Sequence, residues 1–139
     1  MTLPMATPIV ASGETSLVGL LSTLVTTLDP ETFVFLTLPA PQTPPPSLHI
    51  QMWCREAEGL TVITTQSAAV AHGLTYTFPC RMITLNVHSS LEAVGFIAAV
   101  SARLAQRGIG VNPVSGFFHD HCSSCRWGGR GRRWRRYGS

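Results

Sequence analysis

Histidines and cysteines gather near the C-terminal end of the chain, where His119, His121, Cys122 and Cys125 lie within seven residues. Imidazole and thiolate are the ligands that zinc prefers, and it binds four of them in a tetrahedral shell. Structural zinc sites usually take their ligands from two separated segments, whereas these four come from one short stretch. We therefore predict no metal site and keep zinc as an alternative. The C-x-x-C pair does not open a helix after a strand, as redox chemistry prefers.

The last fourteen residues carry six of the ten arginines, together with Trp127, Trp134 and Tyr137. This composition fits contact with phosphates and stacking on the bases of RNA or single-stranded nucleic acid. Residues 1–125 hold four arginines and seven acidic residues, so the net charge of +3 describes the end of the chain and not its body. From Cys122 on, only Arg, Gly, Trp, Tyr, Cys and Ser occur. GC-rich codons give this set when they are translated out of frame or past a splice junction.

The segment His88-Ser89-Ser90 follows a predicted strand and precedes a predicted helix. Free amides at the start of a helix bind anions such as a carboxylate, and Gly95 permits a close approach of a ligand. Ser89 and Glu92 also have the spacing of a capping box, in which both side chains bond to the first turn of a helix.

Catalytic residues are not predicted. Ser89 and Ser90 lie near His88, but adjacent residues rarely form a nucleophile and base, and no third orienting group stands out. The sequence also contains no glycine-rich phosphate loop of the P-loop or dinucleotide type. We therefore predict a protein that is not an enzyme and has no cofactor.

Hydrophobic periodicity predicts the elements that position these residues. Apolar residues at helical spacing predict a helix over 16–28, a short helix over 66–73 and a long helix over 91–107 that buries Ala93, Ile97, Val100 and Leu104. Strands are predicted at 32–38, 48–54, 60–64, 81–87 and 109–120. The helix between the last two strands is a crossover, which favours parallel strands in one sheet. The pattern predicts an α+β fold with helices on one side of a mixed sheet.

The segments SGET (12–15), FVFLTL (33–38), EAEGLTVIT (56–64), 83–109 and VSGFFHDH (114–121) resemble the small tandem ACT proteins of the CASTOR-type ACT family. The resemblance implies a ferredoxin-like ACT sandwich of two ACT-like units. We expect a flexible arm at 1–11, an N-terminal unit at 12–72 with a Pro-rich loop at 39–47, a C-terminal unit at 73–121 and a disordered Arg/Gly/Trp-rich tail at 122–139. In the family an apolar strand and a helix follow the HDH motif, so the second unit is expected to be truncated.

By the same resemblance, the chain is a non-enzymatic regulatory module that binds a small ligand, an amino acid. The ligand-binding residues carried over are His88, Ser89, Ser90, Leu91, Glu92 and Gly95 in one turn, and Ser115, Gly116 and Asp120, with Phe117 and Phe118, on the facing strand. Amides at the helix start would take the α-carboxylate, and Asp120 or Glu92 the α-ammonium. The alternatives are nucleic-acid binding through the tail and a non-functional truncated gene-model variant.

The expected setting is cytoplasmic. No apolar run reaches the roughly 18 residues that span a membrane, and the first residues lack the basic and apolar regions of a secretory signal. Four cysteines in a chain without an export signal indicate reduced thiols. We expect a homodimer with a small-molecule ligand, with nucleic acid contacted only through the tail and no contact with a membrane.

Overall fold

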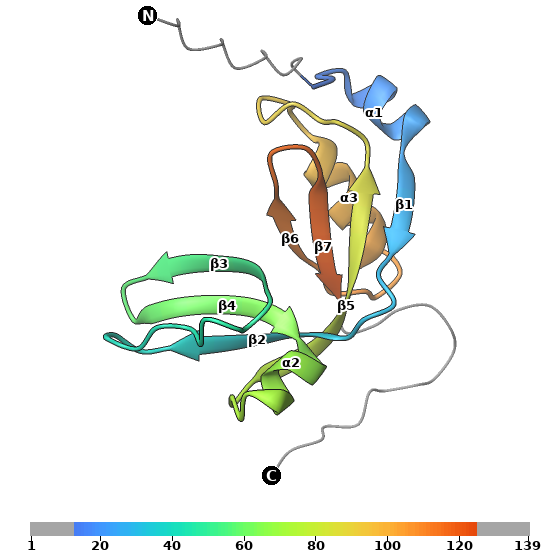
Figure 1. Cartoon of the computed structure of the whole chain (residues 1–139). Helices are drawn as coiled ribbons and strands as arrows, with labels where there is room; N and C mark the ends of the chain where they lie inside the picture. Colours follow the sequence, from blue (N-terminus) through green and yellow to red (C-terminus); the bar gives the residue numbers. More distant parts are fainter. Residues whose placement is uncertain (1–12, 125–139) are drawn as a thin grey trace, which may run out of the picture.

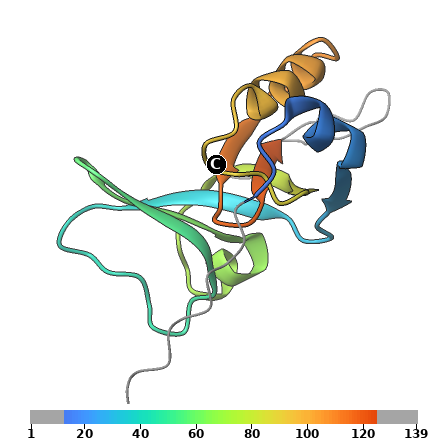
Figure 2. The ribbon, with the colours of Figure 1, turned by 90° about the horizontal axis from the view of Figure 1, so that it is seen from above.

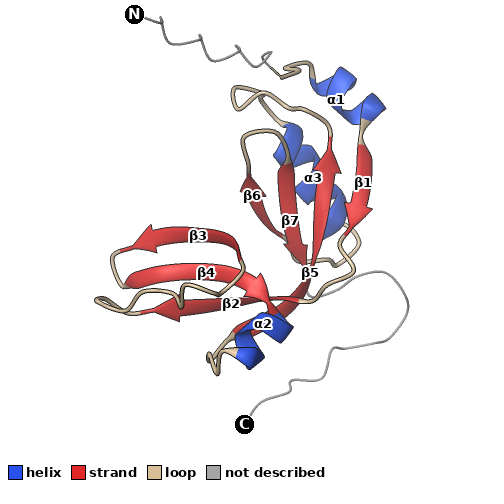
Figure 3. Cartoon of the chain, in the orientation of Figure 1, coloured by secondary structure: helices blue, strands red, loops and turns tan. Residues whose placement is uncertain are grey.

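A computed structural model describes residues 13–124, which form three helices and a seven-stranded sheet (Figures 1 and 3). The arm at 1–11 and nearly all of the predicted tail lie outside these residues. The elements are α1 (Leu17–Thr23), β1 (Val25–Leu28), β2 (Phe33–Leu38), β3 (Ile50–Glu56), β4 (Gly59–Thr65), α2 (Gln66–Ala71), β5 (Thr77–Asn86), α3 (Phe96–Ala105), β6 (Asn112–Ser115) and β7 (Asp120–Ser124). The predicted α+β class is confirmed. No helix of residues 13–124 is long and apolar enough to cross a membrane.

Strand β5 belongs to both halves of the sheet. Its first residues pair with β2, with Phe33 opposite Cys80, and its last residues pair with β1 on one edge and β7 on the other. In Figure 1, β5 passes from the group β3-β4-β2 into the upright group with β1, β7 and β6. The register with β2 shifts between Phe33 and Phe35, and Phe78 opposite this shift has a positive φ of 55°. Bulges of this kind bend a strand, which turns the two halves away from each other.

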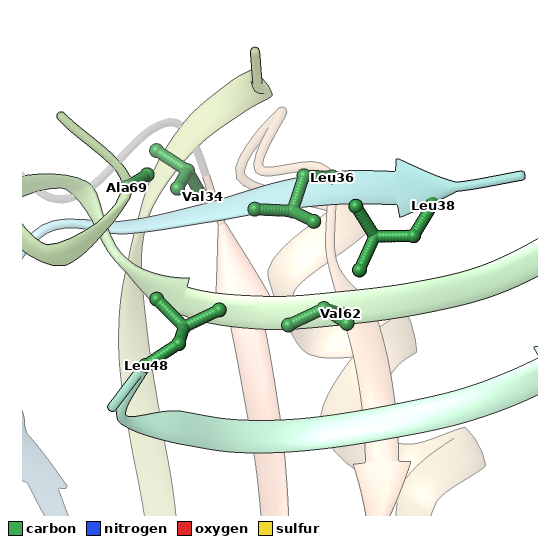
Figure 4. Close-up of a cluster of buried hydrophobic side chains, with 6 residues drawn as sticks. All are labelled: Val34, Leu36, Leu38, Leu48, Val62 and Ala69. Carbon is green, nitrogen blue, oxygen red and sulfur yellow. The ribbon is translucent and has the colours of Figure 1, made fainter. Parts of the chain in front are cut away.

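The first half of the sheet buries its core beneath α2. Alternate residues of β2 point to opposite faces, so Val34, Leu36 and Leu38 share one face, and Phe33 and Phe35 share the other. The first face forms a cluster with residues of α2, β4 and the loop before β3: Val34, Leu36, Leu38, Leu48, Val62 and Ala69 (Figure 4). Residues 39–47 form neither helix nor strand, as expected of the Pro-rich loop.

The second half of the sheet has the strand order β1-β5-β7-β6, with α1 and α3 side by side on one face (Figure 2). Its core cluster comprises Leu20, Ile83, Leu85, Phe96 and Cys122. Because β5 and β6 are both antiparallel to β7, they run parallel to each other, as the crossover predicted. The prediction of a single strand at 109–120 is wrong, because a turn at 116–119 divides this stretch into β6 and β7. Strand β7 then lies between β5 and β6 in the sheet.

The helix predicted at 16–28 is correct only up to Thr23. Ser16 caps α1 by accepting a hydrogen bond from the Gly19 amide, and residues 25–28 form β1. Three of the six residues from 23 to 28 are β-branched threonines, which lose rotamer freedom in a helix and pack well in a sheet. Strand β1 occupies the edge of the sheet beside β5. The expected truncation of the second unit is not confirmed. Cys122 to Ser124, expected in the tail, belong to β7. The division into units at 12–72 and 73–121 stays a prediction.

Substitution of Leu20 tests whether α1 packs on the core of the second half. Its side chain is fully buried against Ile83, Leu85 and Phe96, whereas Val18 on the same helix is 78% exposed. Leu20→Ala should lower the free energy of unfolding in urea by about 2–5 kcal/mol, because it leaves a cavity. Val18→Ala should change it by less than about 0.5 kcal/mol. Equal effects of the two substitutions would show that α1 does not pack on this core.

Candidate ligand-binding site

Two turns meet at one end of the second half of the sheet. Residues 87–95 connect β5 to α3, and residues 116–119 connect β6 to β7. Between them the Ser89 hydroxyl donates a hydrogen bond of 3.0 Å to Oδ2 of Asp120. Both side chains are buried, with exposed fractions of 8% for Ser89 and 5% for Asp120. The structure thus brings together two of the residues predicted for the site, from segments 31 residues apart.

A pocket of about 140 Å³ lies beside this hydrogen bond. Six predicted site residues line it, and four further residues from the start of α3 and the segment before it complete the wall. The lining residues are Ser89, Ser90, Leu91, Gly95, Ser115 and Asp120 from the prediction, and Ala93, Phe96, Ile97 and Ala98 in addition. The helix start was predicted too early, which is why sequence reasoning missed the last three.

Five further candidates lie outside the pocket lining. The His88 ring packs against Phe118 with 5.5 Å between ring centroids, and Phe118 also contacts Phe117. The Gly116 amide donates to the His119 carbonyl and closes the turn between β6 and β7. Glu92 is exposed. His88, Phe118, Phe117 and Gly116 thus make contacts within or between the two turns, and none of the five residues lines the pocket.

Helix α3 begins at Phe96, five residues later than predicted, and Gly95 is its N-cap. The capping box of Ser89 and Glu92 is therefore wrong: Ser89 bonds to Asp120, and the Ser90 hydroxyl accepts from the Glu92 amide. Gly95 has a φ of 89°, a left-handed conformation that suits glycine, and no side chain caps the helix.

The start of α3 leaves backbone donors beside the pocket. The first amide with a partner one turn back is that of Ala99, which donates to the Gly95 carbonyl. The amides of Phe96, Ile97 and Ala98 have no hydrogen-bond partner among residues 13–124, and all three residues line the pocket. Uncapped amides at a helix start carry partial positive charge and attract anions.

The pocket therefore has a negatively charged side, formed by Asp120, and a side with partial positive charge, formed by the first amides of α3. Among the described lining residues, Asp120 carries the only charged side chain, and Ser89 is its only side-chain hydrogen-bond partner within residues 13–124. The second carboxylate oxygen, Oδ1, remains available for a donor. A carboxylate from β7 and the amides of α3 can thus bind one cationic and one anionic group of the same small molecule.

The arrangement of β7 separates the residues that the zinc alternative would need. Cys122 is fully buried in the core cluster beneath α3, while the neighbouring His121 lies on the opposite face, where Nδ1 is 3.0 Å from the Thr84 hydroxyl. Burial, followed by the charge of Asp120, raises the pKa of the Cys122 thiol to about 11, which disfavours the thiolate that binds zinc. Residues 13–124 contain no group of three potential metal ligands. Cys125 lies outside the described residues.

The segment before α1 holds the first turn of the site in place. The Glu14 amide donates to the His88 carbonyl at 2.8 Å, and the Ser90 amide donates to the Glu14 carbonyl at 3.0 Å. A Cβ atom on Gly13 would lie 2.5 Å from the Ser90 nitrogen, so only glycine fits there. The role of Gly13 and Glu14 as a clamp on residues 88–90 was not predicted, although both belong to the SGET motif.

Comparison with known proteins finds similarity to a protein family and to a solved structure. Residues 12–81 match the profile of a family described as ACT domain. A crystal structure of a Vibrio cholerae protein of unknown function, described as a possible transport protein, is 36% identical to this chain. That match covers 76% of this chain and 80% of the other, with a TM-score of 0.67. No curated protein matches the chain.

Gly13→Ala should weaken the clamp on residues 88–90. The new methyl group would meet backbone atoms of Ser89 and Ser90, which cannot move aside as a flexible side chain can. We expect a loss of about 1–3 kcal/mol in the free energy of unfolding and faster hydrogen exchange of the Ser90 amide. Gly110→Ala is the matched control, since a Cβ there meets no atom within 4 Å. Unchanged exchange at Ser90 in Gly13→Ala would contradict the clamp.

His121 should make the stability of the protein depend on pH. Burial, followed by the charge of His119, lowers the pKa of His121, and Asp120 opposes this only in part. The unfolded chain then binds the proton more readily, so stability is full above the unfolded value of about 6.5 and is lost as the pH falls through the lower folded value. Urea unfolding between pH 7.5 and 5 should show this slope. His121→Gln should reduce it and His49→Gln should not; an equal slope in all three proteins would refute the role of His121.

Proposed function

The chain belongs to the ACT domain family, and we propose that it is a non-enzymatic regulatory module that binds an amino acid in the pocket between the β5–α3 and β6–β7 turns. The observation that supports this proposal best is the pairing of one buried carboxylate with three uncapped amides around the same pocket. An α-amino acid carries an ammonium and a carboxylate at a fixed short separation, and these two groups match the carboxylate of Asp120 and the uncapped amides of α3.

Asp120 is the group that we assign to the ammonium. Its Oδ2 is held by Ser89, which fixes the direction of the carboxylate and leaves Oδ1 for the ligand. Glu92, the other residue considered for this role, is exposed and does not line the pocket. Charge-assisted hydrogen bonds of this kind are about twice as strong as neutral ones, so Asp120 would contribute strongly to affinity.

The amides of Phe96, Ile97 and Ala98 are the groups that we assign to the α-carboxylate. A bound carboxylate would cap α3, which has no side-chain cap of its own. The ligand would then connect β7 to α3, and through Phe96 to the cluster that includes Leu20 of α1. Binding would thereby stabilise the whole second half, which is a means by which a ligand can regulate.

The surroundings of Ser89 favour binding over catalysis. Its hydroxyl donates to the carboxylate of Asp120 and not to a histidine. The His88 ring is instead packed against Phe118. A serine in this position orients the carboxylate and lacks the adjacent base that would activate it as a nucleophile.

We further propose a cytoplasmic homodimer. Large apolar side chains are exposed in the two turns that form the site: Leu91, Val94, Phe117 and Phe118. Exposed apolar groups that gather around a pocket are typical of contact surfaces, and a second copy would cover them. Cys54 and Cys122 form no disulfide among the described residues, which agrees with the reducing conditions of the cytoplasm.

Melting temperatures in the presence of single amino acids test the proposed function. At about 100 times its dissociation constant, a ligand adds about 2.7 kcal/mol to the free energy of unfolding, which raises the melting temperature by several degrees. Asp120→Asn keeps the shape and the acceptor for Ser89 but removes the charge, so it should abolish the increase. Glu92→Gln should preserve it.

The melting temperature of each variant without ligand is measured first, so that a folding defect is recognised. An amino-acid panel that leaves the wild-type melting temperature unchanged would refute the proposed function. An increase that persists in Asp120→Asn would refute the assignment of the ammonium.

A further inference from the structure

We infer that the pocket selects amino acids with a small, uncharged side chain, such as glycine, alanine and serine, over larger or charged ones. This inference rests on the proposed function and adds the ligand class to it. It comes from the volume of the pocket, the burial of one of its walls and the distribution of charge around it.

The volume sets the size of the ligand. The pocket measures about 140 Å³, and an apolar protein cavity of about 150 Å³ holds one benzene molecule, which has six non-hydrogen atoms. The ammonium, α-carbon and carboxylate of an amino acid already account for five such atoms. By this comparison room for about one further atom remains, which corresponds to the side chain of alanine, and serine with two atoms is at the upper limit.

One wall of the pocket belongs to a close-packed core. Phe96 is nearly fully buried, and it packs in the cluster with Leu20, Ile83 and Leu85. Close-packed interiors of this kind resist the insertion of additional atoms. On the opposite side, Ser89 and Asp120 are held by their hydrogen bond. A longer side chain must therefore project past the exposed Leu91, into the surface that the proposed second copy would cover.

The charges on the walls exclude ionised side chains. Asp120 is the only charged side chain among the described lining residues, and the ligand's own ammonium would neutralise it. A guanidinium or a second ammonium would find no counter-charge, and a carboxylate side chain would lie near Asp120 and be repelled. The hydroxyls of Ser90 and Ser115, both in the lining, offer hydrogen bonds to a short polar side chain.

Isothermal titration calorimetry on the wild-type protein tests this selectivity with glycine, alanine, serine, leucine, arginine and glutamate. Alanine and serine should bind most tightly, and leucine, arginine and glutamate about tenfold or more weakly. Propionate and ethylamine, which each lack one charged group of alanine, should also bind at least about tenfold more weakly than alanine.

A matched pair of helix variants tests the volume directly. Ala98→Leu adds a side chain to the wall of the pocket, whereas Ala102→Leu adds the same side chain one turn later on α3, outside the pocket. Both positions are exposed, so both variants should fold. Ala98→Leu should weaken alanine binding at least tenfold, and Ala102→Leu should leave it unchanged.

The outcomes separate this inference from the proposed function. If leucine, arginine or glutamate binds more tightly than alanine and serine, the inferred selectivity is wrong while amino-acid binding stands. The same holds if Ala98→Leu binds alanine as the wild type does. If no amino acid binds to the wild-type protein, the proposed function fails together with the inference.

Discussion

The backbone pairing of β5 holds both halves of this protein together. The chain from Val25 to Phe35 runs along one edge of β5, first as β1 and then as β2. At the break between these strands, the Asp29 amide donates to the Met82 carbonyl, and the Arg81 side chain donates to the Asp29 carbonyl. A shift of β5 by one residue would exchange its faces and expose Ile83 and Leu85. The register of β5 therefore fixes the core of the second half, to which Ile83 and Leu85 belong.

The candidate site follows from this register because it begins where β5 ends. Leu85 lies opposite Asp120 in the sheet, and the residues that follow β5 carry Ser89 to the Asp120 carboxylate. The clamp formed by Glu14 then fixes the turn from the other side. After this turn, Gly95 is the N-cap of α3, and the uncapped amides of the next three residues lie at the pocket. The buried Asp120 carboxylate and the start of α3 thus line the same pocket. The sheet determines the position of both.

Local periodicity was sufficient to predict the strands β2, β4 and β5, because each of these depends on the spacing of apolar residues within one segment. The stripe predicted for the long helix is correct only in part: Ile97 and Val100 are half-buried against the second core, whereas the buried Phe96 was not predicted. The resemblance placed Ser89 and Asp120 in facing segments. Partners distant in sequence determined the rest. Residues 25–28 continue a helical pattern but pair with β5 as a strand. Ser89 has the spacing of a helix cap but bonds to Asp120, so α3 starts later. The turn at 116–119, with β7 between β5 and β6, was also not visible in local patterns.

The central claim is that an amino acid bridges Asp120 and the start of α3. Its most direct test is nuclear magnetic resonance of ¹⁵N-labelled protein during titration with L-alanine, since amide signals report on each backbone donor separately. The amide signals of Phe96, Ile97 and Ala98 should shift most as their protons gain an acceptor, with smaller changes at Ser89 and Asp120. If these five signals stay in place at saturating L-alanine, or if the shifts occur in β3 and β4 instead, the account of this site is wrong.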